Sequence, residues 1–220
     1  MKLRNILISI LAVITITTFL VTLSQNTVVR TSEVYSFYFN DSSVVSKLYV
    51  NITNSAFADG ISGFMNSWRP DEFQIYEDTG YDMQGVFDEE ESYNMMCVKK
   101  WVDISFILCM VSFIITVALY WYMIREEEKK LLRRSFRIGA SIGAVISAAE
   151  IALLLSNRGR QWIAEAMGMI PLPEDSELVT VLGPEFMSTA VIFLIIASAV
   201  VFGIAIYVNY RLTRTPRIFY

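Results

Sequence analysis

Two carboxylates lie in stretches of the chain that are otherwise apolar, and they are the first candidates for chemistry. Glu150 lies within residues 147–151, and Asp103 follows Lys99 and Lys100. An ionisable side chain in such a stretch is costly to bury and usually faces the interior of a helix bundle. Paired carboxylates in unequal environments can divide acid and base roles. We therefore take Glu150 and Asp103 as candidate catalytic residues, with a lysine as counter-charge. The alternatives are a structural glutamate between helices and an ordinary lysine-rich membrane boundary.

The remaining composition excludes several common kinds of site. The chain of 220 residues contains no histidine and two cysteines. Without histidine and without a paired-cysteine motif a zinc site is not expected, and a Ser-His-Asp triad lacks its imidazole. The sequence has no phosphate-binding loop and no dinucleotide fingerprint, and we predict no metal and no cofactor. The net charge of -4 argues against nucleic acid as a partner.

Four apolar runs must position these side chains. A bilayer takes roughly 20 residues of helix to cross, and hydrophobic residues make up 54% of this chain. Backbone groups in lipid must be satisfied within the segment, which favours helices. We therefore predict an all-α membrane protein that forms a single membrane domain, residues 1–220. The predicted spans are residues 6–23, 101–124, 138–155 and 188–208.

The basic residues predict how these spans are oriented. Eleven of the 18 lysines and arginines lie in the first four residues, in the loop 125–137 and in the tail after the fourth span. Basic loops stay on the cytoplasmic side, so both termini and the loop 125–137 are predicted to be cytoplasmic in a multi-pass protein of the cell membrane. Segments 24–100 and 156–187 are then extracytoplasmic. The first span fits an uncleaved anchor better than a signal peptide, because no clear cleavage site follows it.

The extracytoplasmic segment 24–100 is expected to be largely helical and to rest on the spans. Asp41 or Ser42 can cap a helix that uses the apolar residues after them. Asp59-Gly60 indicates a turn before a second apolar stretch.

Two further patterns concern the helices of the membrane itself. Asp88 and Glu91 have the spacing of a capping box, which predicts a helix that begins there and continues through the second span. In the third span Gly139, Gly143 and Ser147 recur every four residues, and small residues at that spacing let helices approach closely. We predict that they pack within the bundle rather than in a dimer.

The start of this second-span helix also resembles a known motif. The stretch Glu91-Ser-Tyr-Asn-Met-Met-Cys-Val-Lys99 resembles the Glu-x-x-His-Met-x-Asp-Val-Lys motif of a four-span bacterial membrane family that includes the lipoprotein intramolecular transacylases. The matching positions are Glu91, Met95, Val98 and Lys99. The histidine of the motif is Asn94 here, and its aspartate is Cys97.

A second stretch extends the resemblance over essentially the whole chain. Leu178-Val-Thr-Val-Leu-Gly-Pro-Glu-Phe186 looks like the Leu-Ile…Leu-Pro-Glu-x-Phe-Phe run before the last span of that family. The resemblance implies an active site that faces the outer leaflet. It also implies transfer of an acyl chain, within a bacterial lipoprotein, from the glycerol sn-2 oxygen to the amino group of the N-terminal cysteine. The family depends on two histidines, which correspond to Asn94 and, in a loose alignment, to a position near Gln161.

Our first functional hypothesis is a divergent member of this family with lost or altered catalysis, which binds a lipid or a lipoprotein. Asn94 and Gln161 would be its polar contacts, because neither amide can shuttle protons near neutral pH as imidazole does. Glu91 and Lys99 are the candidate substrate-binding residues. The expected partners are membrane lipids and bacterial lipoproteins, and the oligomeric state stays open.

Two alternatives remain. One is an active acyltransferase that moves the acyl chain with a carboxylate base, for which Glu150, Asp103 and Glu91 are the candidates. The other is a small proton-coupled transporter with Glu150 as its proton site. Four spans without repeats or broken helices argue against the transporter.

Overall fold

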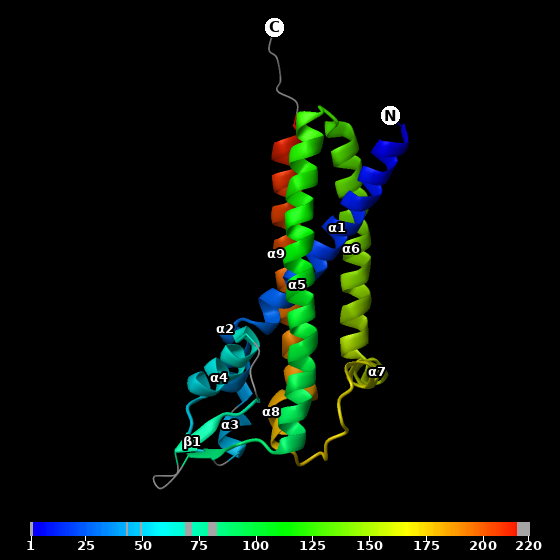
Figure 1. Cartoon of the computed structure of the whole chain (residues 1–220). Coiled ribbons are helices and arrows are strands. Elements are labelled where there is room, and N and C mark those ends of the chain that lie inside the picture. The colour runs from blue at the N-terminus through cyan, green and yellow to red at the C-terminus, as the bar shows by residue number, and fades with distance from the viewer. Residues whose placement is uncertain (1, 43, 49, 69–71, 79–82, 215–220) are drawn as a thin grey trace. The chain divides into compact units, whose positions relative to one another are not determined.

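The computed structural model describes residues 2–42, 44–48, 50–68, 72–78 and 83–214 (Figure 1). Four helices in these residues are long and apolar enough to cross a membrane, which confirms the predicted all-α membrane class. They are α1 (Lys2–Val29), α5 (Glu89–Arg125), α6 (Lys129–Leu155) and α9 (Pro184–Thr213). Each extends beyond the apolar run that predicted it, because helix continues into the polar flanks.

The chain divides into two compact units, to which each long helix contributes a part. We call the first the bundle unit; it comprises Met1–Gln25, Ser105–Glu150 and Ile196–Tyr220. We call the second the insertion unit; it comprises Asn26–Ile104 and Ile151–Ile195.

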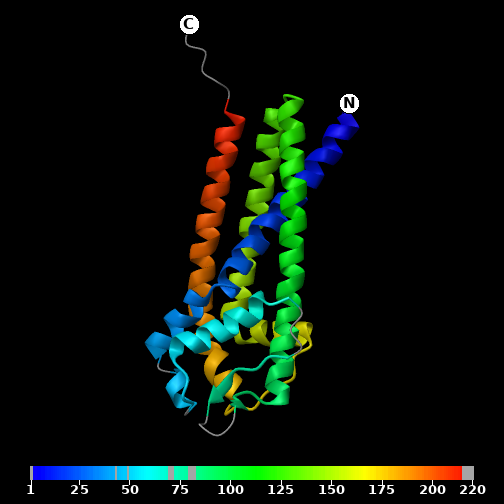
Figure 2. The same ribbon diagram turned by 60° about the vertical axis from the view of Figure 1, so that its left-hand side comes forward.

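In the bundle unit, the stretches of α5, α6 and α9 run side by side and α1 crosses them obliquely (Figures 1 and 2). Six apolar residues form the buried core: Ala12, Ile16, Leu20, Met123, Leu132 and Phe136. Large apolar side chains such as Ile114 and Ile204 remain exposed. In water such exposure would be unfavourable, whereas contact between apolar side chains and lipid tails is favourable.

Small residues bring α6 close to α1 within this bundle. A Cβ added to Gly139 would lie 3.0 Å from the carbonyl oxygen of Val13. The hydroxyl of Thr17 donates to the carbonyl oxygen of Gly139 at 2.9 Å. Gly139, Gly143 and Ser147 are all buried. The predicted close packing of this stripe within the bundle is confirmed.

The insertion unit builds its own core from several short elements. Its helices are α2 (Ser32–Ser42), α3 (Val44–Lys47), α4 (Asn54–Asn66), α7 (Asn157–Met167) and α8 (Glu177–Leu182). Strands β1 (Tyr76–Asp78) and β2 (Met83–Gly85) pair antiparallel, with Tyr76 opposite Gly85. The core is strongly aromatic; Phe39, Phe57 and Phe73 are completely buried.

One prediction for this segment is only partly right and another is wrong. A helix does follow Ser42, but α3 is a single turn instead of a helix through all the apolar residues after it, and Asp41 and Ser42 form the end of α2. Asp59-Gly60 is not a turn but lies inside α4, which Thr53 caps. The residues around it, Phe57, Ala58 and Ile61, are buried in the core, and Ile75 packs against Gly60, where a Cβ would lie 3.1 Å from Cδ1 of Ile75. Tertiary packing therefore overrides the local turn signal.

Candidate functional site

The start of α5, where the sequence resembles the family motif, is fixed by a buried carboxylate. The backbone N–H of Asp88 donates to Oε2 of Glu91 at 3.0 Å, and the N–H of Glu91 donates to Oδ1 of Asp88 at 2.7 Å, so the predicted capping box is confirmed. Oε1 of Glu91 accepts from the hydroxyl of Ser176 at 2.6 Å and from the N–H of Leu178 at 2.9 Å. Glu91 thus joins the first turn of α5 to the first turn of α8. Its side chain is 0% exposed.

Asn94, which the motif resemblance aligns with a histidine, is bonded to the loop after α7. Its Nδ2 donates to the carbonyl oxygen of Ile170 at 2.8 Å, and the N–H of Ile170 donates to its Oδ1 at 2.7 Å. The residue is only 1% exposed. One carboxamide therefore closes a pair of hydrogen bonds with one backbone unit. This arrangement holds the loop in place and leaves no titratable proton at this position.

Lys99 and Asp103 belong to a polar cluster one and two turns further along α5. Nζ of Lys99 lies 2.5 Å from Oδ1 of Asp103, and the guanidinium of Arg30 lies 2.9 Å from the same oxygen. Both cations also donate to the carbonyl oxygen of Met65, at the end of α4. The cluster ties the end of α1 and the end of α4 to α5. Of the two lysines considered as counter-charge for Asp103, the structure pairs Lys99, while Lys100 is exposed.

Replacing Asp103 with asparagine is expected to weaken this cluster, because Lys99 and Arg30 would keep their charges without a carboxylate between them. Asp103 is 28% exposed, so solvent screens part of the loss and we expect about 1.5 kcal/mol less stability. The measurement is thermal unfolding of the purified protein in detergent. Lys100→Gln is the matched control and should unfold at the wild-type temperature. Equal unfolding temperatures for all three proteins would show that the cluster contributes nothing.

Glu150 takes part in a different network, within the bundle unit. Nε2 of Gln25 donates to Oε1 of Glu150 at 2.8 Å, and the hydroxyl of Ser105 donates to Oε1 of Gln25 at 3.1 Å. Side chains from α6, α1 and α5 are therefore joined by one chain of hydrogen bonds. Such a chain satisfies a costly intramembrane carboxyl and also links three helices.

Gln161 lies on α7, in the insertion unit. Its side chain is exposed, and the part of the chain that the structure describes offers it no hydrogen-bond partner. Ser156 caps the helix and Gly168, with φ of 78°, ends it. Trp162, beside Gln161, is 62% exposed. An exposed tryptophan next to polar side chains is typical of a helix at a membrane interface.

The second resembling stretch, 178–186, serves mainly as core. Leu178, Val181 and Phe186 are buried, and the ring of Phe186 stacks on Tyr35 with ring centroids 5.4 Å apart. Burial raises the pKa of the Tyr35 hydroxyl well above its ordinary value. Burial, followed by the charge of Glu185, also raises the pKa of Tyr38. Both tyrosines therefore stay neutral near pH 7 and contribute packing rather than proton transfer.

Sequence reasoning did not identify several partners of these residues. Gln25 and Arg30 are unremarkable polar residues near the end of α1, and Ser176 lies in a polar loop. The partners of Asn94 are backbone atoms of Ile170, which no side-chain pattern can reveal. The capping-box spacing did predict the hydrogen bonds between Asp88 and Glu91, but it did not predict those that Glu91 accepts from the start of α8.

The fold and these clusters define an all-α, multi-pass integral membrane protein with a polar, buried start to its longest helix. Among solved structures, the chain is similar to the membrane-integral lipoprotein intramolecular transacylase Lit from Bacillus cereus. The TM-score is 0.67 at 14% identity, over 96% of this chain and 98% of that one. A form with a histidine-to-arginine mutation gives 0.66 at 12% identity, over 97% and 96% of the two chains. A histidine-to-alanine form gives 0.70 at 14%, over 97% and 93%.

These likenesses establish a shared fold over nearly the full length of both proteins. No model of a protein family matches the chain, and no curated protein matches it in sequence.

Proposed function

We propose that this protein binds a lipid or the lipid-modified end of a bacterial lipoprotein, and that it lacks imidazole-based transacylase chemistry. The observation that carries the proposal is the bonding of the Asn94 side chain. At the position of the family's histidine, its carboxamide is buried and closed by two hydrogen bonds to Ile170. A neutral amide in that state neither takes nor gives a proton near pH 7. The Lit fold supports a lipoprotein as the partner.

The buried residues of the motif have an indirect part in this proposal. Glu91 is completely buried and Lys99 is 2% exposed, and the polar atoms of both side chains are engaged. We assign them the role of positioning α5 and the loop after α7. They affect substrate binding indirectly, by holding these backbone segments in place. Exposed side chains of α7, Gln161 among them, are the direct polar contacts for a headgroup. Basic loops on the cytoplasmic side would place these contacts at the outer leaflet.

The decisive experiment is expression in a bacterium that lacks its own transacylase, followed by mass spectrometry of lipoprotein N-termini. We expect the diacylglyceryl form with a free amine to persist. A strain that expresses Lit is the positive control. Appearance of the N-acyl, lyso-glyceryl form would overturn the loss of catalysis. In that case, activity abolished in Glu150→Gln but kept in Asn94→Ala would identify a carboxylate base.

Binding is tested separately with the purified protein and a synthetic diacylglyceryl-cysteine peptide. We expect Gln161→Ala to weaken binding about fivefold, the loss of one or two exposed hydrogen bonds. Glu90→Gln, another exposed change outside α7, is the control and should bind as the wild type does. Absence of binding by the wild type would refute the lipoprotein partner.

A further inference from the structure

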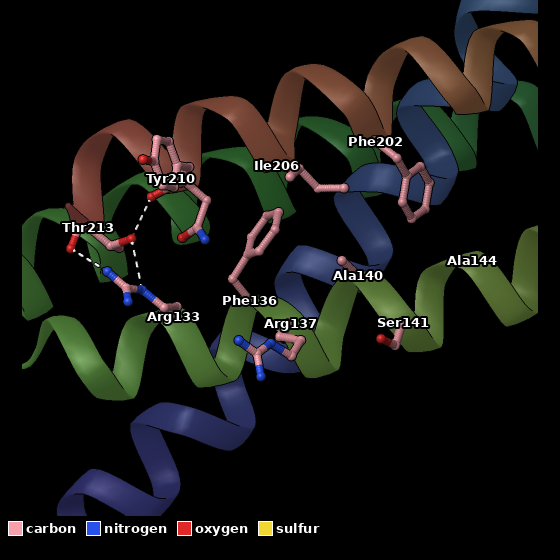
Figure 3. A pocket seen from close by; sticks show the side chains of 11 residues that line it. Arg133, Phe136, Arg137, Ala140, Ser141, Ala144, Phe202, Ile206, Tyr210 and Thr213 are labelled. Carbon is pink, nitrogen blue, oxygen red and sulfur yellow. Dashed lines mark hydrogen bonds between the residues drawn. The ribbon is translucent and has the colours of Figure 1, made fainter.

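A cavity of about 460 Å³ lies between α6 and α9 in the bundle unit. This volume is within the roughly 300–1,000 Å³ that ligand pockets usually have. Figure 3 shows that the two helices form its opposite sides, with side chains from both directed into the space between them. None of the residues discussed for the proposed function lines it.

One end of this cavity is basic and hydrogen-bonded into a fixed shape. Arg133 donates from its guanidinium to the carbonyl oxygen of Thr213 at 2.8 Å, and the Thr213 hydroxyl donates to the carbonyl oxygen of Asn209 at 2.7 Å. Asn209 in turn accepts from the hydroxyl of Tyr120 at 3.1 Å. Thr213 and Asn209 are buried. Arg133 is exposed, but its guanidinium is bonded to the end of α9 and so has a fixed position.

Arg137 lies one helical turn from Arg133 on α6 and is exposed. No hydrogen bond reaches its guanidinium in Figure 3, and none of the residues that the structure describes pairs with it. The eleven lining residues contain these two arginines and no carboxylate. The carboxylates of Glu126 and Glu128, from the preceding loop, contact Arg4 and Asn5 instead. The basic end is thus one whose positive charge is not neutralised within the cavity.

The other end of the cavity is apolar and belongs to the membrane-spanning stretches. Its walls there are Ala140, Ala144, Phe202 and Ile206. A ligand that fits both ends needs an anionic head and an apolar tail. Phosphates are recognised by paired arginines, and basic pockets between transmembrane helices bind acidic phospholipid headgroups. A zwitterionic headgroup would bring an ammonium group, for which the lining offers no carboxylate.

We propose that this cavity binds one anionic phospholipid. Its phosphate lies at Arg133 and Arg137, and one acyl chain lies along the apolar wall formed by Ala140, Ala144, Phe202 and Ile206. The site does not depend on the proposed function and lies at the helix ends that carry the basic loop 125–137. By the preference of such loops for the cytoplasm, the ligand belongs to the inner leaflet.

The test is native mass spectrometry of the full-length protein in detergent with phosphatidylglycerol or phosphatidylcholine of identical acyl chains. We expect the wild type to prefer phosphatidylglycerol, and Arg137→Gln to reduce that binding by about fivefold to tenfold with phosphatidylcholine unchanged. Arg134→Gln makes the same charge change on α6 but does not line the cavity, so it should bind as the wild type does. Arg137 is exposed and unpaired, so its replacement should leave thermal unfolding unchanged.

A second variant tests the acyl part of the site without changing charge. Ala144→Phe puts a ring into the apolar wall and should reduce the binding of both lipids. Equal losses in Arg134→Gln and Arg137→Gln, or equal binding of the two lipids, would overturn the site in favour of diffuse attraction to a basic surface. Displacement of phosphatidylglycerol by glycerol phosphate at similar concentration, with no effect of Ala144→Phe, would show a site for free phosphate and refute the lipid.

Discussion

Glu91→Ala is expected to lower the free energy of unfolding by about 3–4 kcal/mol, the largest effect of the substitutions we consider. The carboxylate accepts hydrogen bonds from the hydroxyl of Ser176 and from the backbone N–H groups of Leu178 and Asp88. Alanine would leave these donors without an acceptor in a buried site, and each such donor costs about 1–3 kcal/mol. Partial access of water to the opened site keeps the total below the sum of the three.

The control for this prediction is Glu90→Ala, one position earlier in the same helical turn. Glu90 is exposed, so its replacement should change stability by less than about 0.5 kcal/mol. Glu91→Gln should lie between the two, because the amide keeps one acceptor but loses the charge. Thermal unfolding in detergent gives all three values. Similar unfolding temperatures for Glu90→Ala and Glu91→Ala would mean that the buried carboxylate is not a structural link.

The same hydrogen bonds explain how this chain can match part of the motif without its histidine. Glu91, Met95 and Lys99 match the motif and are all buried. Glu91 holds α8, Met95 belongs to the core of the insertion unit, and Lys99 bridges Asp103 and Met65. These positions are occupied for structural reasons. A match at them therefore predicts the fold and carries no information about the chemistry.

Local patterns were enough to predict the parts of the fold that the membrane imposes. Apolar runs of bilayer length predicted α1, α5, α6 and α9, since helices in lipid must satisfy their own backbone groups. The Asp88–Glu91 spacing predicted the first turn of α5, because a capping box is completed within four residues. The stripe at Gly139 and Gly143 predicted close helix approach, because small residues at a four-residue spacing leave room for a neighbouring helix.

The insertion unit and the polar partners could not be predicted in this way. Asp59-Gly60 has a strong turn signal, yet it is helical within α4, which buries Phe57 and Ile61 on either side of it. The partner of Glu150 is Gln25, which lies 125 positions away. Such pairs are created by the packing of α1 against α6 and have no local signature. Candidate residues could therefore be identified by type, but their bonds required the structure.

The packing of α1 against α6 is itself open to a test with a large expected effect. Gly139→Leu should lower stability by about 2–3 kcal/mol. Its Cβ alone would lie 3.0 Å from the carbonyl oxygen of Val13 and 3.2 Å from the side chain of Ile16, so the helices must separate. Separation also stretches the hydrogen bond from Thr17 to the Gly139 carbonyl. The gain in helix propensity on replacing glycine, about 1 kcal/mol, offsets only part of this loss.

Gly203→Leu on α9 separates the steric cost from the propensity gain. A Cβ at Gly203 meets no atom within 4 Å among the described residues, and the position is exposed. The same substitution there should leave stability unchanged or raise it slightly. Since both changes add the same apolar side chain to a membrane helix, any difference between them in detergent reports the closeness of α1 to α6. If Gly139→Leu unfolded at the temperature of Gly203→Leu, then the glycine contact would not stabilise the bundle, and the network from Glu150 through Gln25 would have to hold α1 in its place.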